Sequence, residues 1–187
     1  MSVLSFSRSD SIVFPEEVQG YPIDPRFRNI MWILRILNDE TKSPRQRIAY
    51  ALRSFFREDI PEENAIEMLY GFLNAGQESS EEDREPPHMD FEFDADEIYA
   101  DFWREYRIDL FTDDAMHWYR FLALLGGLSD YGALSRKIQI RTRDISKLKG
   151  KERADAEKAK ERVQIPQHMT AEELREAEAF EAEWGSL

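Results

Sequence analysis

The residues of this chain that could do metal or acid–base chemistry are concentrated between positions 90 and 114. Eight carboxylates there are candidates: Asp90, Asp94, Asp96, Glu97, Asp101, Glu105, Asp113 and Asp114. A metal site would require several of them to converge on one point from different elements, and the Glu-x-x-His pairs of di-iron helix bundles do not occur. Many fall near expected helix N-termini, where capping and the helix dipole favour acids. We therefore predict structural roles and no metal.

The three histidines give little support for a catalytic site. His117 stands between Met116 and Trp118 on an expected helix, with no serine or cysteine nucleophile indicated near it, so we interpret it as packed or hydrogen-bonded. His88 and His168 fall in expected loops. The chain has no cysteine, no HExxH, no glycine-rich phosphate loop, no GxSxG and no zinc pattern. We predict a protein that is not an enzyme and has no cofactor.

Aromatic side chains in the same part of the chain are candidates for stacking on nucleic-acid bases. They are Trp103, Tyr106, Trp118, Tyr119 and Phe121. These aromatics alternate with acids, and residues 58–105 hold seventeen Asp or Glu against two Arg. Because phosphate binding requires a basic surface, we predict that the aromatics pack in the core and that nucleic acid is not a partner.

Charge is distributed unevenly along a chain whose net charge is −13. In contrast to the acidic middle, residues 134–163 hold eleven Lys or Arg and five acids, a balance of +6. One interpretation is that these are solvated helix faces and an acidic loop. The other is electrostatic complementarity to a partner or to further copies of the chain, so self-association stays open.

The elements that must position these side chains are helices. Residues 91–125 contain ten aromatics, and Asp94 with Glu97 fits a capping box at the start of a helix. Thr112 is the expected N-cap of a second helix, and the short link between the two predicts an antiparallel pair. We expect this helical hairpin to form the core of the fold.

The first elements of the chain have clear boundary signals. Residues 1–24 are interpreted as an extended segment or a loose hairpin that turns at Gln19 and Gly20. Asp24 as N-cap and Pro25 at the first helical position predict the start of a helix. That helix is apolar on more than one side, which indicates a central helix buried between its neighbours.

Two further helices are expected before the acidic loop. Ser43 followed by Pro44 repeats the cap-and-proline signal and predicts a second helix. Pro61 opens a third helix that ends at Gly76. Gly71 lies inside this third helix, where glycine costs about 1 kcal/mol relative to alanine, so we expect a close helix crossing there.

The second half of the chain is more polar. Residues 77–90 are acidic and aperiodic, which predicts a surface loop. Residues 132–148 have roughly helical spacing, although alternation within them leaves a strand possible. Residues 149–164 predict a charged, alanine-rich helix that is either solvated or bound to a partner. Thr170 and Glu173 form a capping box for a last helix.

These signals predict a mainly α fold. We expect a compact multi-helix bundle with an extended segment at 1–24, a helical core domain at 25–148 with an acidic loop at 77–90, and a charged helical extension at 149–187. The N-terminus lacks the basic start and long apolar run of a signal peptide. No window approaches eighteen uncharged apolar residues, so no membrane association is predicted.

The stretch around residues 91–128 also resembles a known family. Its pattern is F-x-F-D-x-D-x-x-I-Y-x-x-F-x-x-x-Y-x-I-D-L, then a His-Trp pair and an aromatic–aliphatic helix. The matching positions are Phe91, Phe93, Asp94, Asp96, Ile98, Tyr99, Phe102, Tyr106, Ile108, Asp109, Leu110, His117, Trp118 and Phe121. The pattern is similar to that of phage proteins named by a gene-product number and encoded between the major tail and tape measure genes of long-tailed phages. The resemblance covers residues 12–149, and Arg107 stands where the family has a glycine.

The resemblance implies a tail assembly chaperone, a small helical protein that escorts the hydrophobic tape measure protein. The implied partners are the tape measure protein and, in addition, a companion chaperone or a tail tube subunit, in the cytoplasm of the host cell during assembly. Such proteins lack catalytic residues, so no site residue carries over, and the partner-binding surface stays unknown. The alternative is a structural tail or tail-tip component that remains in the virion.

Overall fold

The structure is a computed structural model, and it describes residues 5–6, 12–60, 62–74 and 88–165. The fold is mainly α-helical and compact, as predicted. Its helices are α1 (Phe27–Leu37), α2 (Pro44–Phe55), α3 (Glu62–Leu73), α4 (Ala95–Tyr106), α5 (Trp118–Gly126), α6 (Ala133–Thr142) and α7 (Gly150–Val163). Most of the expected acidic loop and the expected last helix lie outside the described residues. No helix in the described ranges has the length and apolar character needed to cross a membrane.

Short antiparallel strands precede the helices. Strand β1 (Ser5–Phe6) pairs with β2 (Ile12–Val13), and β3 (Glu17–Val18) pairs with β4 (Tyr21–Pro22). The second pair turns at Gln19 and Gly20, which have φ angles of 52° and 84°. Two consecutive positive φ angles are the signature of the tight turns that match strand twist, and glycine adopts them without a steric penalty. The hairpin predicted at this position is confirmed.

Helix α1 starts later than predicted, at Phe27 rather than Pro25. The Asp24 carboxylate accepts hydrogen bonds from the backbone N–H and Nε of Arg26 and does not cap the helix. The carbonyl oxygen of Pro25 accepts the N–H of Trp118 at 2.7 Å. Because this long-range bridge uses the backbone before Phe27, the helix cannot begin there.

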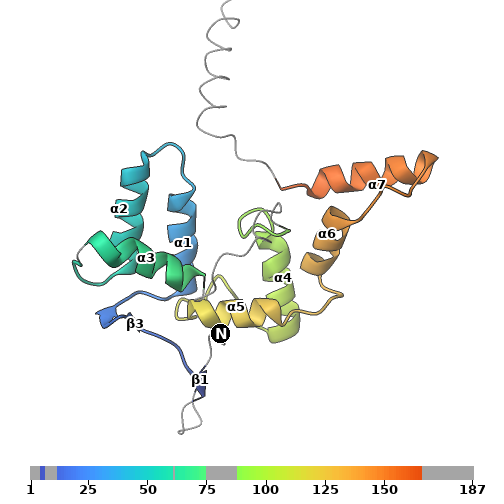
Figure 1. Cartoon of the computed structure of the whole chain (residues 1–187). Helices are drawn as coiled ribbons and strands as arrows, with labels where there is room; N and C mark the ends of the chain where they lie inside the picture. The colour runs from blue at the N-terminus through green and yellow to red at the C-terminus, as the bar shows by residue number, and fades with distance from the viewer. Residues whose placement is uncertain (1–4, 7–11, 61, 75–87, 166–187) are drawn as a thin grey trace, which may run out of the picture.

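The prediction that α1 is buried on more than one side is wrong. Its buried residues, Phe27, Ile30 and Ile33, lie on one face. Trp32, which the sequence placed on a second apolar stripe, is 45% exposed. Helix α1 therefore packs on α2 and α5 along one side and leaves part of its apolar surface open to solvent (Figure 1).

The next two helices follow their local signals. The Ser43 hydroxyl accepts the N–H of Gln46 at 3.3 Å, and the Ser43 N–H donates to the Gln46 side chain at 3.0 Å, which completes a capping box for α2. The helix predicted after Pro61 is confirmed as α3. The close crossing expected at Gly71 is wrong, since a Cβ there would meet nothing within 4 Å.

The predicted antiparallel hairpin of residues 91–125 is wrong in its second half. Helix α5 begins at Trp118 with His117 as N-cap, so Thr112 does not cap it. Residues 107–117 form a longer connection, with turns at Asp109 whose side chain accepts the N–H of Phe111 at 2.9 Å. Figure 1 shows α5 running across the lower end of α4 rather than alongside it.

The link after α4 begins with a strained residue. Arg107 adopts a left-handed conformation with φ of 57° and ends the helix by donating its N–H to the Trp103 carbonyl. This conformation costs a non-glycine residue roughly 1–2 kcal/mol. Glycine would remove that cost, but it also makes the unfolded chain more flexible, which cancels part of the gain in stability. We expect Arg107→Gly to raise the free energy of unfolding by about 0.5–1 kcal/mol.

Urea denaturation of the Arg107→Gly variant measures this effect. Arg104→Gly is the control, because Arg104 lies inside the last turn of α4, where glycine lowers the stability by about 1 kcal/mol. A lower midpoint for Arg107→Gly than for the wild type would show that the backbone strain at Arg107 is not the dominant effect.

Helices α6 and α7 resolve the ambiguity of residues 132–148. The possible strand does not form, because α6 is helical from Ala133 to Thr142 and is followed by a turn region. The charged helix predicted at 149–164 is confirmed as α7. Helix α7 packs mainly on α6, and the one residue that it buries is Ala156.

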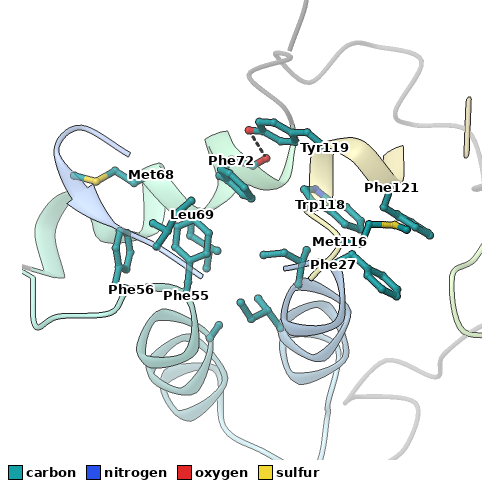
Figure 2. Close-up of a cluster of buried hydrophobic side chains, with 14 of the residues drawn as sticks. Phe27, Phe55, Phe56, Met68, Leu69, Phe72, Met116, Trp118, Tyr119 and Phe121 are labelled. Carbon is teal, nitrogen blue, oxygen red and sulfur yellow. Dashed lines mark hydrogen bonds between the residues drawn. The ribbon is translucent and has the colours of Figure 1, made fainter. Parts of the chain in front are cut away.

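The core is dominated by aromatic rings, and the rings of α5 contact rings of both α3 and α4. Figure 2 shows the contact with α3, between Tyr119 and Phe72. Tyr119 of α5 stacks on Phe72 of α3 with ring centroids 4.6 Å apart, and Phe72 also contacts Phe55 of α2 at 5.1 Å. Phe121 of α5 stacks on Phe102 of α4 at 5.3 Å. Each such ring contributes about 1.5–3 kcal/mol through burial. The predicted core role of residues 91–125 is therefore confirmed.

Candidate functional site

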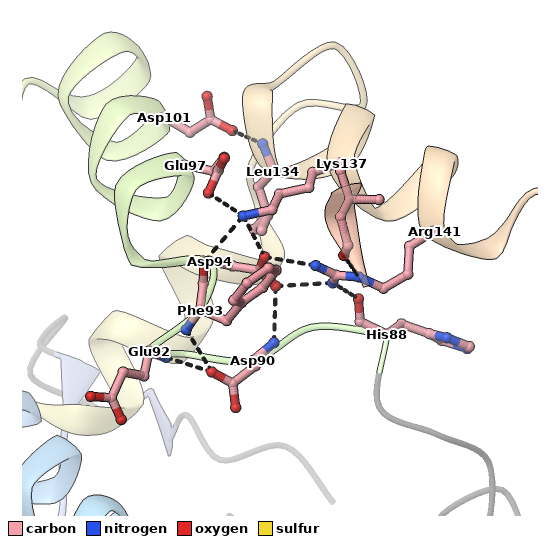
Figure 3. A network of polar contacts seen from close by, with 11 residues as sticks. His88, Asp90, Glu92, Phe93, Asp94, Glu97, Asp101, Leu134, Lys137 and Arg141 are labelled. Atoms are coloured by element: carbon pink, nitrogen blue, oxygen red, sulfur yellow. Dashed lines mark hydrogen bonds and ion pairs between the residues drawn. The ribbon is translucent and has the colours of Figure 1, made fainter. Parts of the chain in front are cut away.

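The candidate carboxylate Asp94 lies in a buried ion-pair network between α4 and α6 (Figure 3). Its side chain has no solvent exposure, and its two oxygens accept hydrogen bonds from Arg141 at 2.8 and 3.0 Å. Lys137 lies 3.0 Å from the same carboxylate, and the N–H of Asp90 donates to it at 3.0 Å. The predicted capping box is wrong, because Asp94 makes no cap hydrogen bond within α4.

Glu97 completes the same network rather than a cap. It pairs with Lys137 at 2.8 Å, and the ammonium group of Lys137 also lies 4.4 Å from the centre of the Phe93 ring. Burial alone would raise the pKa of Asp94, but the hydrogen bonds from Arg141, the Asp90 N–H and Lys137 lower it below the ordinary value. The network therefore holds an ionised carboxylate between two cations in the interior.

Asp101 caps a helix, but that helix is α6 and not its own. Its fully buried carboxylate accepts the N–H groups of Ala133 and Leu134, each at 2.9 Å. These N–H groups lie in the first turn of α6, where they have no acceptor within the helix and where the helix dipole favours a negative charge. A Cβ on Gly132 would lie 2.3 Å from Asp101 Oδ2, so only glycine allows the carboxylate to approach this closely.

The other acidic candidates are used separately. Asp90 and Asp113 accept N–H groups of their own turns, Glu105 binds Ser129, Asp114 pairs with Arg28, and Asp96 is exposed. The described residues include no group of three or more His, Cys, Asp or Glu that could hold a metal ion. The structure thus distributes the eight carboxylates among helix docking, turns and surface. It brings two pairs of them together around a shared cation, Asp94 and Glu97 around Lys137, and Asp101 and Glu105 around Arg104.

His117 is packed and hydrogen-bonded, as predicted, although it precedes α5 rather than lying on it. Its Nδ1 accepts the N–H of Tyr119 at 3.0 Å, and its Nε2 lies 2.9 Å from the Pro15 carbonyl oxygen, which requires the proton on Nε2. Phe14 stacks on the ring at 4.8 Å. Burial lowers the pKa of His117 below its ordinary value, opposed by the Pro15 carbonyl. His88 lies at the start of the described segment before α4, and His168 lies outside the described residues.

Three of the five predicted core aromatics are buried, Tyr106 is half-buried, and Trp103 is exposed. Trp118, Tyr119 and Phe121 are buried, and Tyr106 donates its hydroxyl to the Leu124 carbonyl at 2.9 Å. Burial raises the pKa of Tyr119 to about 12. Trp103 is 47% exposed, so its predicted core role is wrong. The reason is that it lies on the face of α4 opposite the buried Ile98 and Phe102.

A hollow of about 340 Å³ lies where α1, α3 and α5 meet, and we call it the groove. Its lining is mainly apolar, and these residues form it: Leu34, Leu37, Asn38, Tyr70, Leu73, Asn74, Phe91 and Trp118. Tyr70 is 45% exposed at the side, whereas Trp118 is 2% exposed and forms the floor. Concave apolar surfaces with a few polar groups are typical of binding sites.

Trp118, which lines the groove, carries a buried polar group that makes no hydrogen bond within the described residues. Within the described ranges, the indole Nε1 of Trp118 is the one buried side-chain nitrogen or oxygen without a hydrogen-bond partner. Such a group costs about 1–3 kcal/mol and is rare in native proteins. Its backbone position is fixed by the hydrogen bond to Pro25, and its ring contacts Phe121 and Phe91. Strong local packing therefore maintains the floor of the groove.

Sequence reasoning did not identify the groove. Its residues come from the ends of α1 and α3 and from positions 91 and 118, and each belongs to an apolar pattern that helix packing already explains. The one signal was the excess of apolar positions on α1 beyond a single buried face.

A match to a known protein family covers most of the chain. A family model described as "Bacteriophage Gp15 protein" matches residues 9–165. The chain belongs to this phage protein family. The match includes the groove, the buried ion pairs and all the described helices, so these features lie within the family's domain. A search of curated proteins found no match, and a search of solved structures found none either.

Proposed function

We propose that this Gp15 family member is a non-enzymatic tail assembly chaperone that binds the tape measure protein of its phage in the host cytoplasm. Membership of the phage family and the resemblance of residues 12–149 to proteins encoded beside the tape measure gene support the proposal. The observation that carries it is the groove, because it offers an apolar surface with no occupant from the described chain.

The groove has the chemistry of a site for an amphipathic helix. Leu37 and Leu73 come from the last turns of α1 and α3, and Tyr70 projects beside them. Asn38 and Asn74 at the rim can donate and accept hydrogen bonds. Apolar side chains of a partner helix, spaced three and four residues apart, would bury themselves between these walls.

The side chains that were candidates for catalysis support a non-enzymatic role, because they are used in hydrogen bonds and ion pairs within the fold. Asp94 and Asp101 hold α6 against α4, and both nitrogens of His117 are used in hydrogen bonds. A general base or nucleophile needs a free atom within reach of a substrate. Asp94 and Asp101 are engaged in the packing of α6 on α4, and His117 caps α5, one of the helices that frame the groove.

Co-expression with the tape measure protein tests the proposal. We expect the tape measure protein to become soluble and to co-purify with this chain. An insoluble tape measure protein and no complex would contradict the chaperone function. Mass spectrometry of purified virions separates the two roles, because a chaperone is absent from the finished particle and a structural tail component is present.

The groove itself is tested by a matched pair of variants. Tyr70→Ala removes a groove wall, and we expect it to weaken tape measure binding about thirtyfold, the effect of a hot-spot aromatic worth about 2 kcal/mol. Tyr50→Ala is the control, because Tyr50 is equally exposed on α2 (46% against 45%) and does not line the groove. Equal affinities of the two variants, measured by calorimetry, would place the binding surface elsewhere.

A further inference from the structure

The groove lies close to the end of α7, although the two are far apart in the sequence. Arg141 links them, because its Nε donates to the Val163 carbonyl at 2.7 Å and its Nη2 donates to Asp94 at 2.8 Å. Asp94 lies three residues after Phe91, which lines the groove, and three residues span at most about 11 Å. The end of α7 is therefore within about 20 Å of the groove.

Beyond α7 the chain continues with a segment that has the sequence pattern of an amphipathic helix. Thr170 and Glu173 form the expected capping box of this helix. Its apolar residues are spaced three, three and four positions apart, and they are Leu174, Ala177, Phe180 and Trp184. Helices that bind in apolar grooves use this spacing. We call residues 170–184 the C-terminal segment and its four apolar residues the stripe.

The C-terminal segment is long enough to reach the groove and to cover it. Residues 164–169 extend up to about 20 Å, which equals the separation between the end of α7 and the groove. Residues 171–184 span about 21 Å as a helix. Because the segment belongs to the same chain, its effective concentration at the groove is in the millimolar range, about that of a short flexible linker. A separate copy of the chain has no such advantage.

The other long stretch outside the described residues lacks the side chains to fill an apolar groove. Residues 77–87 lie between the groove residues Asn74 and Phe91 in the sequence, but their apolar side chains are limited to Pro86 and Pro87. Placing their acids against an apolar surface would remove those charges from water without compensation. The C-terminal segment is therefore the better occupant.

The charges near the groove are compatible with the same occupant. Glu173 and Glu181 each lie four positions from Ala177, so they flank the stripe. At the edge of the groove, the partly exposed Arg47 donates to the carbonyl of Leu37, a groove residue, at 3.1 Å. An exposed ion pair contributes less than about 1 kcal/mol, so the apolar stripe and the attachment to the chain decide the docking.

We propose that the C-terminal segment docks as a helix in the groove of its own chain and covers it until the tape measure protein displaces the segment. The displacement rests on the proposed function, whereas the docking does not. A covered groove keeps apolar surface away from solvent and from unrelated proteins. The tape measure protein then binds only the fraction of chains whose groove is open, which lowers its apparent affinity.

Thiol labelling of the full chain tests the docking. Because the chain has no cysteine, Ala177→Cys places a single thiol in the stripe, and Ala179→Cys places one on the opposite face of the same helix. We expect a maleimide to label the first thiol at least about tenfold more slowly than the second, in a ratio independent of protein concentration. Equal rates would overturn the docking. A ratio that grows with protein concentration would also overturn it, because the segment would then bind another copy.

A further substitution tests whether the groove is the docking site. Tyr70→Glu removes an aromatic wall of the groove and adds a negative charge beside an acidic segment. In the Ala177→Cys chain, we expect it to raise the labelling rate at least about fivefold. Tyr50→Glu is the matched control, because Tyr50 is equally exposed on α2 and does not line the groove. With a helical circular dichroism spectrum for both variants, protection that survives Tyr70→Glu would place the segment elsewhere and overturn the proposal.

Tape measure binding tests the displacement. The double variant Phe180→Ala and Trp184→Ala removes half of the stripe, so we expect it to bind the tape measure protein about tenfold more tightly than the wild type. The control Glu172→Ala and Arg175→Ala changes the opposite face without changing the net charge, and it should bind like the wild type. An unchanged affinity of the stripe variant would overturn the displacement. If neither the wild type nor any variant binds, the proposed function fails together with the displacement, and the labelling still decides the docking.

Discussion

Replacing Phe121 with alanine is expected to lower the free energy of unfolding by about 3–5 kcal/mol, as is typical of a buried aromatic. Phe121 is 2% exposed and contacts four other rings. Its ring centroid lies 5.1 Å from Phe27, 5.3 Å from Phe102, 5.6 Å from Trp118 and 6.0 Å from Phe91. The alanine variant leaves a cavity where α1, α4 and α5 meet. Because the three helices are tightly packed, they cannot all move to fill it.

Phe111→Ala is the matched control for this variant. Phe111 belongs to the same stretch of sequence, but it is 72% exposed and has one ring contact, to Tyr99 at 4.8 Å. We expect a loss within about 0.5 kcal/mol, the usual range for surface positions, in urea denaturation of both variants. Similar losses for the two would mean that the ring cluster around Phe121 is not the energetic centre of the fold.

Elements whose signals are local were predicted well. The start of α2 at Ser43 and Pro44 and the hairpin turn at Gln19 and Gly20 each depend on residues that are adjacent in the sequence. Capping and turn energies are set by the residues themselves, so neighbouring sequence is enough to specify them. The core role of Phe121 was predictable because helical spacing alone put it on an apolar face.

Elements whose boundaries depend on distant contacts were not predicted. The start of α1 moved because Pro25 and Arg26 bridge to residues 116–118, and the start of α5 moved with it. Asp94 satisfies every local criterion for a capping residue. Its carboxylate binds Arg141, forty-seven residues away, because a buried ion pair outweighs the roughly 1 kcal/mol of a cap. No local pattern contains that information.

The residues of the candidate site likewise divide into features with local signals, which could be predicted, and long-range contacts, which could not. The acids could be recognised as candidates because of their type and density, but the capping roles predicted for Asp94 and Glu97 were wrong. Their partners could not be predicted, since Asp101 caps α6 and Glu97 pairs with Lys137 across two helices. The groove depends on how the ends of α1 and α3 meet around Trp118, and only the assembled fold shows it.

Replacing Asp94 with alanine is expected to cost about 3–5 kcal/mol, because it leaves buried cations without their counter-ion. Arg141 and Lys137 are 10% and 14% exposed, and both point at the Asp94 carboxylate. Asp96→Ala is the control, because Asp96 lies in the same first turn of α4 but is exposed. Its interaction with the helix dipole accounts for a loss below about 1 kcal/mol. Equal losses would show that the buried pair contributes no more than a surface charge.

The pH dependence of the same variant separates the ion pair from simple packing. Hydrogen bonds from Arg141 and Lys137 lower the folded-state pKa of Asp94 below the ordinary value of 3.8, so its contribution to stability is complete above that value. As the pH falls through the lower folded pKa, Asp94 protonates in the wild type and the contribution is lost. The difference in urea midpoint between wild type and Asp94→Ala should therefore be constant from about pH 7 to 5 and shrink below about pH 4. A difference that stays the same at low pH would mean that the lost volume of the side chain, and not its charge, holds α6 on α4.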